Sequence, residues 1–476
     1  MSQVQLPKRH PFWLVLCAAL PLLSACVGLN PQADTQHLNQ QYPQFTQGLW
    51  AGANSAMAPA ELDEALSSEL SQAAAVAVAL RHSPVMKALI AEQTARTATL
   101  VQQGRLPNPV LSLERLVTGP EVDIGRLMTI GLVDVLTLPW RQAAAGRALE
   151  WGQAMQAQIL VDHVTAVRMA WVDAVAAQAR AQYAQQVFES ASASSELAHR
   201  MQQAGNFTAL DRMRQQGFQA DAVAMVAQTN LSVRQTRETL VRLLGLSAEH
   251  AERLRLPGRL PDIPAAPSSV KDTMEQARDR IDLQVALAWL NHESARRGVV
   301  IPASWLDVEL GVRRDSARDT STGQGSRGRG GELDLTLPLF DDGSVIRQRL
   351  DASLQAAAAR VQTVLVQASS HVRQAHDTYR TAHELARHYQ TELIPLRRKM
   401  AEENLLRYNA MMISVFELLA DNREQIAVVS RALDAQAQFW RADAALQASV
   451  VGRPIGAQSP MPQSTAVQSY AAVDRH

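Results

Sequence analysis

The sequence predicts a mainly helical protein with a two-fold internal repeat, in which a helix, two strands and long helices follow one another twice. Three observations lead to this fold class. The segment Leu-Thr-Leu-Pro at residues 136–139 occurs again at residues 335–338. Each copy follows a strand-like stretch and precedes a long stretch of helical sequence, and residues 140–255 contain no proline. Such a repeat is considered first because it determines how every later motif is placed.

Residues 1–25 have the features of a lipoprotein signal peptide. Lys8 and Arg9 precede an apolar stretch over residues 12–22, which is shorter than the roughly 20 residues of a membrane-spanning helix. The stretch ends in Leu-Ser-Ala-Cys, which resembles a bacterial lipobox, so we expect Cys26 to carry a covalent lipid. Val27 indicates the outer membrane, since Asp at this position is typical of inner-membrane retention. An ordinary signal peptide is the alternative.

Composition and charge argue against several classes of protein. The 46 basic and 46 acidic residues balance, which gives no reason to expect nucleic-acid binding. Cys17 would leave with the signal peptide, so Cys26 would be the only mature thiol and no disulfide is expected. Aromatic residues make up 5% of the chain, which is typical of extended helices packed by small residues. No later stretch of about 18 apolar residues predicts a helical membrane span.

The first repeat is expected at residues 71–256, after a polar, lipid-anchored linker over residues 26–70. Two prolines, Pro107 and Pro109, require an extended chain before the first strand. The two strands form a β-hairpin within residues 110–138. The expected elements are a helix over residues 71–103, strands over residues 110–117 and 127–138, and two long helices that meet near Gly205 and Asn206.

A proline-rich joint over residues 257–270 leads to the second repeat, residues 271–450. Its two strands form a β-hairpin within residues 305–339. The expected elements are a helix over residues 271–297, strands over residues 305–313 and 332–339, and long helices from Ser344 that are interrupted at Pro395 and turn near Asn409. Residues 451–476 are rich in Pro, Gln and Ser and are expected to form a disordered tail.

The last two strands alternate between apolar and charged residues. In the third strand, Val308 and Leu310 alternate with Asp307 and Glu309. This period of two fits a strand of an outer-membrane barrel, with lipid outside and water inside, and a soluble half-buried sheet is the alternative. The first hairpin is less regular because Asp134 interrupts its apolar face.

Four strands cannot close a transmembrane β-barrel on their own. An open sheet edge is not tolerated in hydrocarbon, and known barrels begin at eight strands. We therefore expect the chain to oligomerise, with eight strands from two copies or twelve from three. Both ends of each hairpin return to one side of the membrane, so the long helices would extend on that side and form a tube.

Several segments appear together in an order that is typical of one family. They are Leu106–Pro109, the two Leu-Thr-Leu-Pro segments, Leu339–Gly343, Gly205–Asp211, Leu243–Leu246 and Tyr408–Asp421. Through them the chain resembles the TolC-like family of outer-membrane efflux proteins, in its lipoprotein branch, from Cys26 to Val450.

The resemblance implies a homotrimer with a 12-stranded barrel and a long α-helical periplasmic tunnel, in the outer membrane of a Gram-negative bacterium. Its partners would be a periplasmic adaptor protein, an inner-membrane transporter and outer-membrane lipid. The trimer would passively conduct what the transporter exports. No cofactor is implied, apart from the lipid on Cys26.

The resemblance also places a periplasmic gate at the two turns between long helices. Asp211 and Tyr408 match positions that hold the tunnel tip closed, and Glu417 would form an acidic ring that favours cations. The chain departs from an Asp–Arg latch, because Ile413 stands where a basic partner can lie. The alternative for Asp211 and Glu417 is a solvated carboxylate at the start of a helix.

The same two turns are expected to contact the adaptor through small or apolar residues. These residues are Gly205, Phe207, Leu210, Met411 and Met412. Exposed Met and Phe side chains at a helix turn suit a helical partner, while packing between helices is the alternative for Leu210. Met411 stands where the family usually has Gly.

Two motifs suggest enzymatic chemistry, and neither supports it. Residues 323–328 have the letters of a dinucleotide fingerprint, but that motif needs a strand before it and a helix after it, and here it joins two strands. His383 and His388 are five residues apart, so they point in different directions from a helix and cannot share a metal ion. We therefore expect neither an enzyme nor a metal site.

Two functions fit the sequence: a passive export duct, and a lipid-anchored periplasmic coiled-coil protein without a pore. The alternation in the last two strands favours the duct. Drugs, metal ions, solvents and peptides all stay possible as substrates. The loop between these strands is rich in arginine, which we interpret as solvated, with contact to lipopolysaccharide phosphates as the alternative. Its arginines are Arg313, Arg314, Arg318, Arg327 and Arg329.

Overall fold

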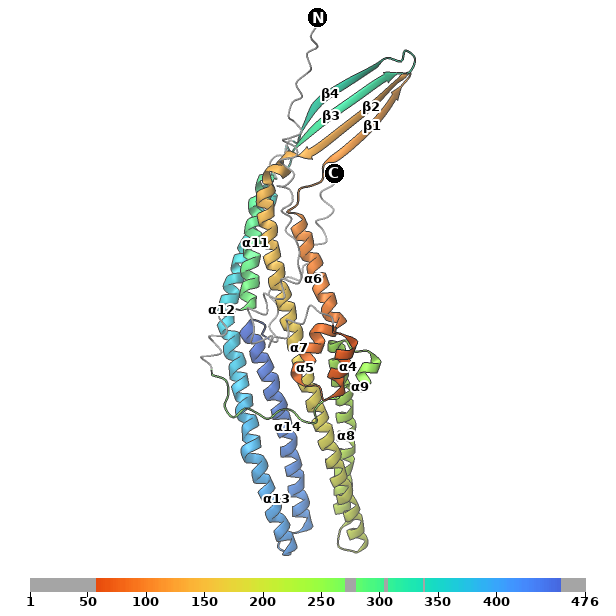
Figure 1. Cartoon of the computed structure of the whole chain (residues 1–476). Coiled ribbons are helices and arrows are strands. Elements are labelled where there is room, and N and C mark those ends of the chain that lie inside the picture. Colours follow the sequence, from red (N-terminus) through yellow and green to blue (C-terminus); the bar gives the residue numbers. More distant parts are fainter. Residues whose placement is uncertain (1–56, 270–279, 304–306, 337–338, 455–476) are drawn as a thin grey trace. The chain divides into compact units, whose positions relative to one another are not determined.

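The computed structural model describes residues 57–269, 280–303, 307–336 and 339–454 (Figure 1). Within these ranges the chain is mainly helical and contains one four-stranded sheet. The helices are α4 (Pro59–Ser67), α5 (Gln72–His82), α6 (Pro84–Gln102), α7 (Leu132–Gln203), α8 (Ala209–Leu244), α9 (Ala248–Arg253), α11 (Ile281–Ala303), α12 (Ser344–His388), the π-helix η3 (Tyr389–Leu393), α13 (Ile394–Asn409) and α14 (Val415–Val451). The strands are β1 (Val110–Thr118), β2 (Glu121–Gly131), β3 (Asp307–Asp319) and β4 (Gly325–Thr336).

The chain divides into two compact units, which we call the sheet unit and the helical unit. The sheet unit contains Thr94–Gln153 and Leu287–Ala358, and the helical unit contains Gln32–Gln93, Ala154–Ala286 and Ala359–His476, as far as these are described. Cys26 and the expected signal peptide lie outside the described residues, as do residues 455–476 of the expected tail.

The sheet is antiparallel throughout, with the strands in the order β1-β2-β3-β4 (Figure 1). The two expected hairpins are therefore present, and β2 pairs with β3 between them. The register continues along all three strand pairs without an extra residue, so no β-bulge interrupts the alternation of side chains. Paired residues on neighbouring strands therefore project their side chains from the same side of the sheet, along its whole length.

The predicted strand bounds were wrong in both hairpins. β2 begins at Glu121 and ends at Gly131, so the first Leu-Thr-Leu-Pro segment lies inside α7 rather than at the end of a strand. β3 and β4 extend through most of the expected arginine-rich loop, and only residues 320–324 connect them. The glycine-rich segment 325–331 pairs with β3, because strand pairing requires only backbone hydrogen bonds and not particular side chains. Residues 337–338 of the second segment lie outside the described residues.

Asp134 explains why the apolar alternation stops in the first hairpin. It lies in the first turn of α7, where the positive end of the helix dipole favours a carboxylate. Arg141 forms an ion pair with Asp134 and also donates to the backbone oxygens of Gln103 and Arg105, at 2.9 and 3.1 Å. One arginine thus joins the start of α7 to the segment that leads into β1.

The helices follow the prediction with four corrections. α4 lies within the expected irregular linker. The expected helix over residues 71–103 is divided at Ser83, because Pro84 cannot donate the backbone hydrogen bond that would continue α5. α11 continues to Ala303, beyond the expected end at residue 297. α7 is longer than predicted, and its 72 residues correspond to about 108 Å.

Within the described ranges, none of the helices has by itself both the length and the hydropathy of a membrane span. α5 and α6 reach these values only as a pair, and they are bent by 52° relative to each other.

The helical unit is held together by a core of aromatic and small residues. Phe439 of α14 is fully buried and packs against Tyr379 of α12, with their ring centroids 5.4 Å apart. His383 lies against the same Phe439 ring and shares a hydrogen bond with the backbone oxygen of Pro264, at 2.8 Å. The proline-rich joint therefore packs along α12 and α14.

This unit also contains a charged pair, in which Arg168 is buried and Asp443 is half-buried. Arg168 of α7 is 6% exposed and lies near Asp443 of α14. Burial raises the pKa of the Asp443 carboxyl to about 6, although the nearby Arg168 charge and a hydrogen bond from Gln447 oppose that shift. Burial also lowers the pKa of Arg168. The loss of hydration thus outweighs the mutual attraction of the two groups.

The raised pKa of Asp443 predicts a pH dependence of stability. The folded state favours the protonated carboxyl, so this group's contribution is complete below its unfolded pKa of 3.8 and is lost as the pH rises through about 6. Between pH 4.5 and 7.5, wild type should lose about 2 kcal/mol more unfolding free energy than Asp443→Asn. Denaturant unfolding at both pH values measures this. Equal losses in the two proteins would contradict it.

Candidate functional site

The first turn between long helices lies between α7 and α8. Gly205 has a φ of 77°, and the backbone N–H groups of Gly205 and Asn206 donate to the oxygens of Gln202 and Met201 at 3.0 and 2.9 Å. This is the glycine-dependent Schellman arrangement that ends a helix. Thr208 then begins α8, its hydroxyl oxygen accepting from the backbone N–H of Asp211 at 3.2 Å.

The second turn, between α13 and α14, repeats this pattern with a different residue at its centre. Met411 has a φ of 60°, and is the one non-glycine residue with positive φ in the described parts of the chain. The N–H groups of Met411 and Met412 donate to the oxygens of Tyr408 and Arg407, at 2.9 and 2.8 Å. Ser414 accepts from the N–H of Glu417 at 3.3 Å. Met411 therefore occupies a backbone position that favours glycine.

The three expected gate residues lie at these turns but have different surroundings. Asp211 completes a capping box with Thr208, accepting from its hydroxyl at 2.6 Å, and lies 3.4 Å from the guanidinium of Arg214. Its carboxylate therefore stabilises the start of α8. Glu417 occupies the equivalent position of α14 but is exposed. Tyr408 is 38% exposed at the end of α13.

The expected apolar contact surface needs one correction. Phe207 is only 7% exposed, because it packs with Ala198 and Met201 of α7 and with Val415 and Leu419 of α14. It belongs to a core that joins the two turns, so the expectation that its side chain is exposed was wrong. The residues that do expose apolar side chains there are Leu210 at 54%, Met411 at 94% and Met412 at 74%.

The sequence analysis missed the arginines that connect the helices near the turns. Arg423 of α14 donates to the side-chain oxygen of Gln215 on α8 at 3.0 Å, and its guanidinium lies 4.6 Å from the centre of the Phe218 ring. Arg397 of α13 pairs with Glu424 at 2.7 Å and with Asp421 at 3.7 Å. Arg423 could have been predicted to contact another helix, because it lies four residues after Leu419 and therefore on the same side of α14.

One face of the sheet is acidic, and we call it the carboxylate face. Because strand side chains alternate and the register has no bulge, its members follow from the strand pairing. Its acidic residues are Glu114, Glu121, Asp123, Asp307, Glu309, Asp315, Asp319, Glu332 and Asp334. Arg313 lies among them, 3.1 Å from Asp315 and 3.8 Å from Glu332.

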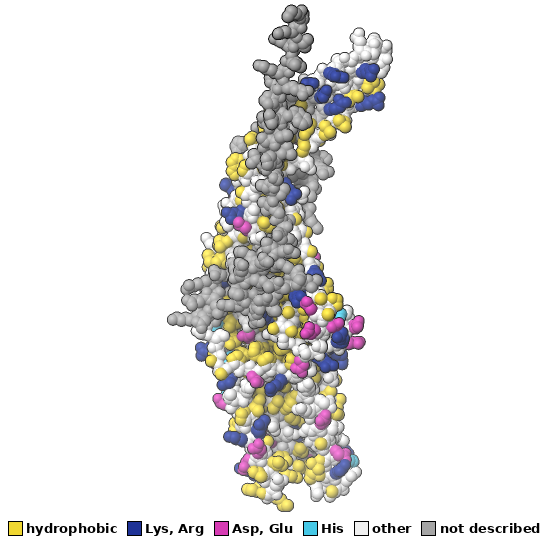
Figure 2. All heavy atoms as spheres, in the orientation of Figure 1, with side chains coloured by type: hydrophobic (Ala, Val, Ile, Leu, Met, Phe, Trp, Pro, Cys, Tyr) yellow, Lys and Arg dark blue, Asp and Glu magenta, His cyan; other side chains and the backbone are white. Residues whose placement is uncertain are grey.

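The opposite face of the sheet, which we call the apolar face, carries none of the acidic residues of the four strands. Many of its side chains are exposed, including Leu113 at 70% and Val312 at 69%. Figure 2 shows apolar side chains on the sheet with dark-blue arginines beside them. The apolar members are Leu111, Leu113, Val117, Val122, Ile124, Met128, Ile130, Val308, Leu310, Val312, Leu333 and Leu335.

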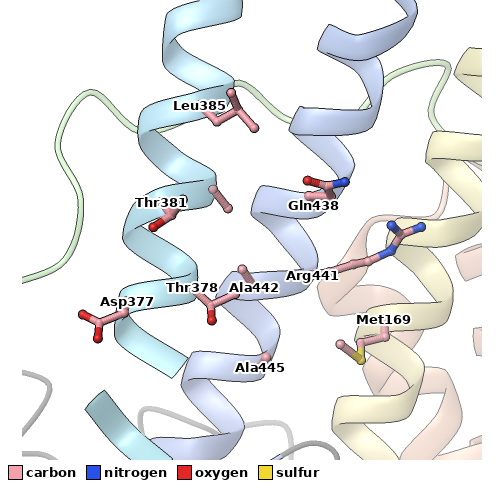
Figure 3. A pocket seen from close by; sticks show the side chains of 10 residues that line it. Met169, Asp377, Thr378, Thr381, Leu385, Gln438, Arg441, Ala442 and Ala445 are labelled. Atoms are coloured by element: carbon pink, nitrogen blue, oxygen red, sulfur yellow. The ribbon is translucent and has the colours of Figure 1, made fainter. Parts of the chain in front are cut away.

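The two motifs that suggested enzymatic chemistry lie in the turn before β4 and in α12. Residues 323–328 end a turn and begin β4, so no helix follows the glycines. His388 lies 3.1 Å from Glu392, and no group of three or more potential metal ligands occurs among the residues that the structure describes. A groove between α12 and α14 is lined mainly by threonine, alanine and leucine, and Arg441 on its rim pairs with Asp173 (Figure 3).

Solved structures of outer-membrane channels share this fold. The outer-membrane channel OprN matches with a TM-score of 0.66 at 20% identity, over 84% of this chain and 93% of that chain. VceC, an outer membrane protein from Vibrio cholerae, matches with a TM-score of 0.64 at 15% identity, over 83% and 96%. The open state of the MtrE channel from Neisseria gonorrhoeae matches with 0.63 at 16% identity, over 80% and 89%. No protein-family model and no curated protein matches the chain.

These matches extend over nearly the whole length of the solved channels. At such low sequence identity they establish the fold alone, which is that of these outer-membrane proteins and agrees with the fold that the resemblance to TolC-like proteins predicted. The lipoprotein branch stays a prediction, since Cys26 lies outside the described residues.

Met411 gives a prediction about the second turn. A non-glycine residue in the left-handed region costs about 1 kcal/mol, and this side chain is 94% exposed, so Met411→Gly loses little packing. We expect the variant to slow amide hydrogen exchange around residues 407–417. Gly205→Ala, at the matching position, should speed exchange around residues 201–211. Faster exchange in Met411→Gly would contradict the assignment.

Proposed function

We propose that the chain is the passive outer-membrane exit duct of a tripartite efflux system. Three copies would close one 12-stranded barrel, with the apolar face towards lipid and the carboxylate face towards the water-filled pore. The observation that carries the proposal is the separation of the two faces: all nine carboxylates of the strands lie on one face, and most of the exposed apolar side chains lie on the other. This is the pattern of a transmembrane barrel with an aqueous interior.

The edges of the sheet support assembly. β1 and β4 each pair on one side only within the described chain, so their outer backbone groups lack partners. Each unsatisfied group would cost several kcal/mol in hydrocarbon, and pairing β1 of one copy with β4 of the next removes that cost. Nothing in a half-buried soluble sheet would require such closure.

The N-terminal anchor fits the same location. We propose that Cys26 carries the lipid and that residues 26–56 connect it to the described part of the chain. A single acyl chain anchors weakly, and several chains on one cysteine anchor stably. The barrel and the anchor would then hold the protein in the same membrane.

The two turns are the proposed contact site for the periplasmic adaptor, through which an inner-membrane transporter would deliver substrate. The exposed side chains of Leu210, Met411 and Met412 offer an apolar surface to a helical partner. Phe207 is buried between the two turns and holds them together through its packing in one core. Gly205 contributes its backbone conformation rather than a side chain.

Planar bilayers test the proposal directly. The purified full-length protein should insert and give discrete conductance steps, and its detergent-solubilised mass should be that of a trimer. The alternative, a lipid-anchored coiled-coil protein, predicts no pores and solubility without detergent once the lipid is removed. Pore-free protein that stays soluble in this way would overturn the duct.

The carboxylate face predicts the charge preference of the pore. Glu309 and Asp334 face each other across β3 and β4. Replacing them by Gln and Asn removes six negative charges from a trimer, so the cation-to-anion permeability ratio should fall roughly twofold or more. Reversal potentials under a salt gradient measure the ratio. The double control Glu64→Gln with Glu252→Gln, on exposed sites of α4 and α9, should leave it unchanged.

The proposed gate gives a second electrical prediction. In a closed trimer the exposed Glu417 side chains would form an acidic ring, so Glu417→Lys should reduce or reverse cation preference in the narrow state. Unchanged selectivity in Glu417→Lys would exclude the ring.

Asp211→Asn should instead destabilise the start of α8 by about 1 kcal/mol, because the carboxylate of Asp211 is part of a capping box.

A further inference from the structure

The apolar face carries a second kind of residue that the channel function does not account for. Six arginines point to this face, which has no acidic residue. They are Arg115, Arg126, Arg314, Arg318, Arg327 and Arg329. All six are exposed, and none of them forms an ion pair with a residue that the structure describes.

Three of these arginines lie directly beside one another. Arg126 of β2 faces Arg314 of β3, and Arg314 faces Arg329 of β4. Like charges at directly opposed strand positions destabilise a sheet. The row would therefore be costly unless negative charge from another molecule lies against it.

Arg313 shows that the arrangement is not a general property of these strands. It neighbours Arg314 in sequence but points to the carboxylate face, where it lies 3.1 Å from Asp315 and 3.9 Å from Glu114. The carboxylates are thus close in sequence to the six arginines but lie on the opposite face of the sheet, where they cannot pair with them. The four strands therefore offer the six arginines no carboxylate on their own face.

The position of the arginines along the strands suggests the source of that charge. The rows that contain Val308, Leu310 and Val312 are apolar, and the arginines begin with the next row and continue towards the strand-connecting turns. The apolar part of β3 is about 14 Å long at roughly 3.4 Å per residue. On β3 and β4 the surface thus changes from apolar to cationic, as a membrane boundary does, whereas β1 and β2 combine arginine and apolar residues in the same rows.

We propose that these arginine rows bind the phosphate groups of anionic lipid in the outer leaflet of the membrane. The inference rests on the proposed function, which orients the apolar face towards lipid. Guanidinium groups bind phosphate oxygens through two parallel hydrogen bonds, and their long apolar stems allow them to lie against acyl chains. Continuity with the apolar rows favours a lipid phosphate over a soluble anion.

The structure corrects the expectation that the arginine-rich segment is a loop. Arg314, Arg318, Arg327 and Arg329 lie in regular strands and on one face, while Arg313 lies on the other. Arg115 and Arg126 of the first hairpin, which the sequence did not connect with them, complete the surface.

The test uses the purified full-length protein in detergent, titrated with lipopolysaccharide, and compares wild type with Arg126→Gln/Arg314→Gln/Arg329→Gln. Each arginine near an anionic surface contributes about fivefold in affinity, so the triple variant should bind at least about tenfold more weakly. Arg313→Gln, on the carboxylate face, should bind like wild type. Equal binding by the triple variant would overturn the proposal, as would full competition by millimolar inorganic phosphate, which indicates a soluble-anion site.

Two further measurements separate the possible failures. Arg314→Lys keeps the charge but loses the paired hydrogen bonds, so it should fold and bind with intermediate affinity even if the triple variant does not fold. Binding by Arg314→Lys and Arg126→Lys that equals wild type would exclude specific phosphate recognition. Wild-type pores in bilayers together with arginine-independent lipid binding would refute this inference alone, whereas absence of pores would refute the proposed function.

Discussion

The open edges of the four-stranded sheet are the constraint on which the rest of this structure depends. β1 and β4 have backbone groups on their outer sides that the described chain does not satisfy. The apolar face exposes leucine and valine side chains over both hairpins. A sheet with these properties is unfavourable in water because of its apolar face and in hydrocarbon because of its edges. In the proposed barrel, pairing with further copies of the chain would satisfy the edges, and lipid would cover the apolar face.

The uninterrupted register determines which side chains lie on each face of the sheet. Since side chains alternate with a period of two, a slip of one residue would move the carboxylates and the apolar residues to the wrong faces. The register therefore separates the nine carboxylates from the six arginines of the apolar face, and in the proposed barrel these faces would be the pore side and the lipid side. At the turns between helices, a matching hydrogen-bond pattern is built around Gly205 in one case and Met411 in the other. The second turn thus combines a less favourable backbone conformation with a highly exposed side chain at Met411.

The sequence predicted the order of the elements, the long helices and the two hairpins, because these depend on local periodicity and on helix-breaking residues. It misplaced the strand ends. Leu136–Pro139 has the pattern of a strand when it is taken alone. It lies in α7, however, where Asp134 and Arg141 form an ion pair near the start of the helix. The glycine-rich arms of β3 and β4 lack side-chain signals for a strand and depend on pairing partners distant in sequence. Phe207 was expected at the surface, since its burial depends on α14, more than 200 residues away.

The central claim is that β1 of one copy pairs with β4 of the next to close a ring of three. Two cysteines, at Cys17 and Cys26, are present in the whole chain, so a lipidated, processed protein offers a background without free thiols for crosslinking. Pairs of cysteines would be introduced, one at Ser112 or Thr118 of β1 and one at Ser326 or Thr336 of β4, and oxidised in membranes. The account predicts that at least one pair gives covalent dimers and trimers and no larger species. Monomers alone from every pair, or a ladder extending beyond three copies, would contradict the closed trimeric barrel.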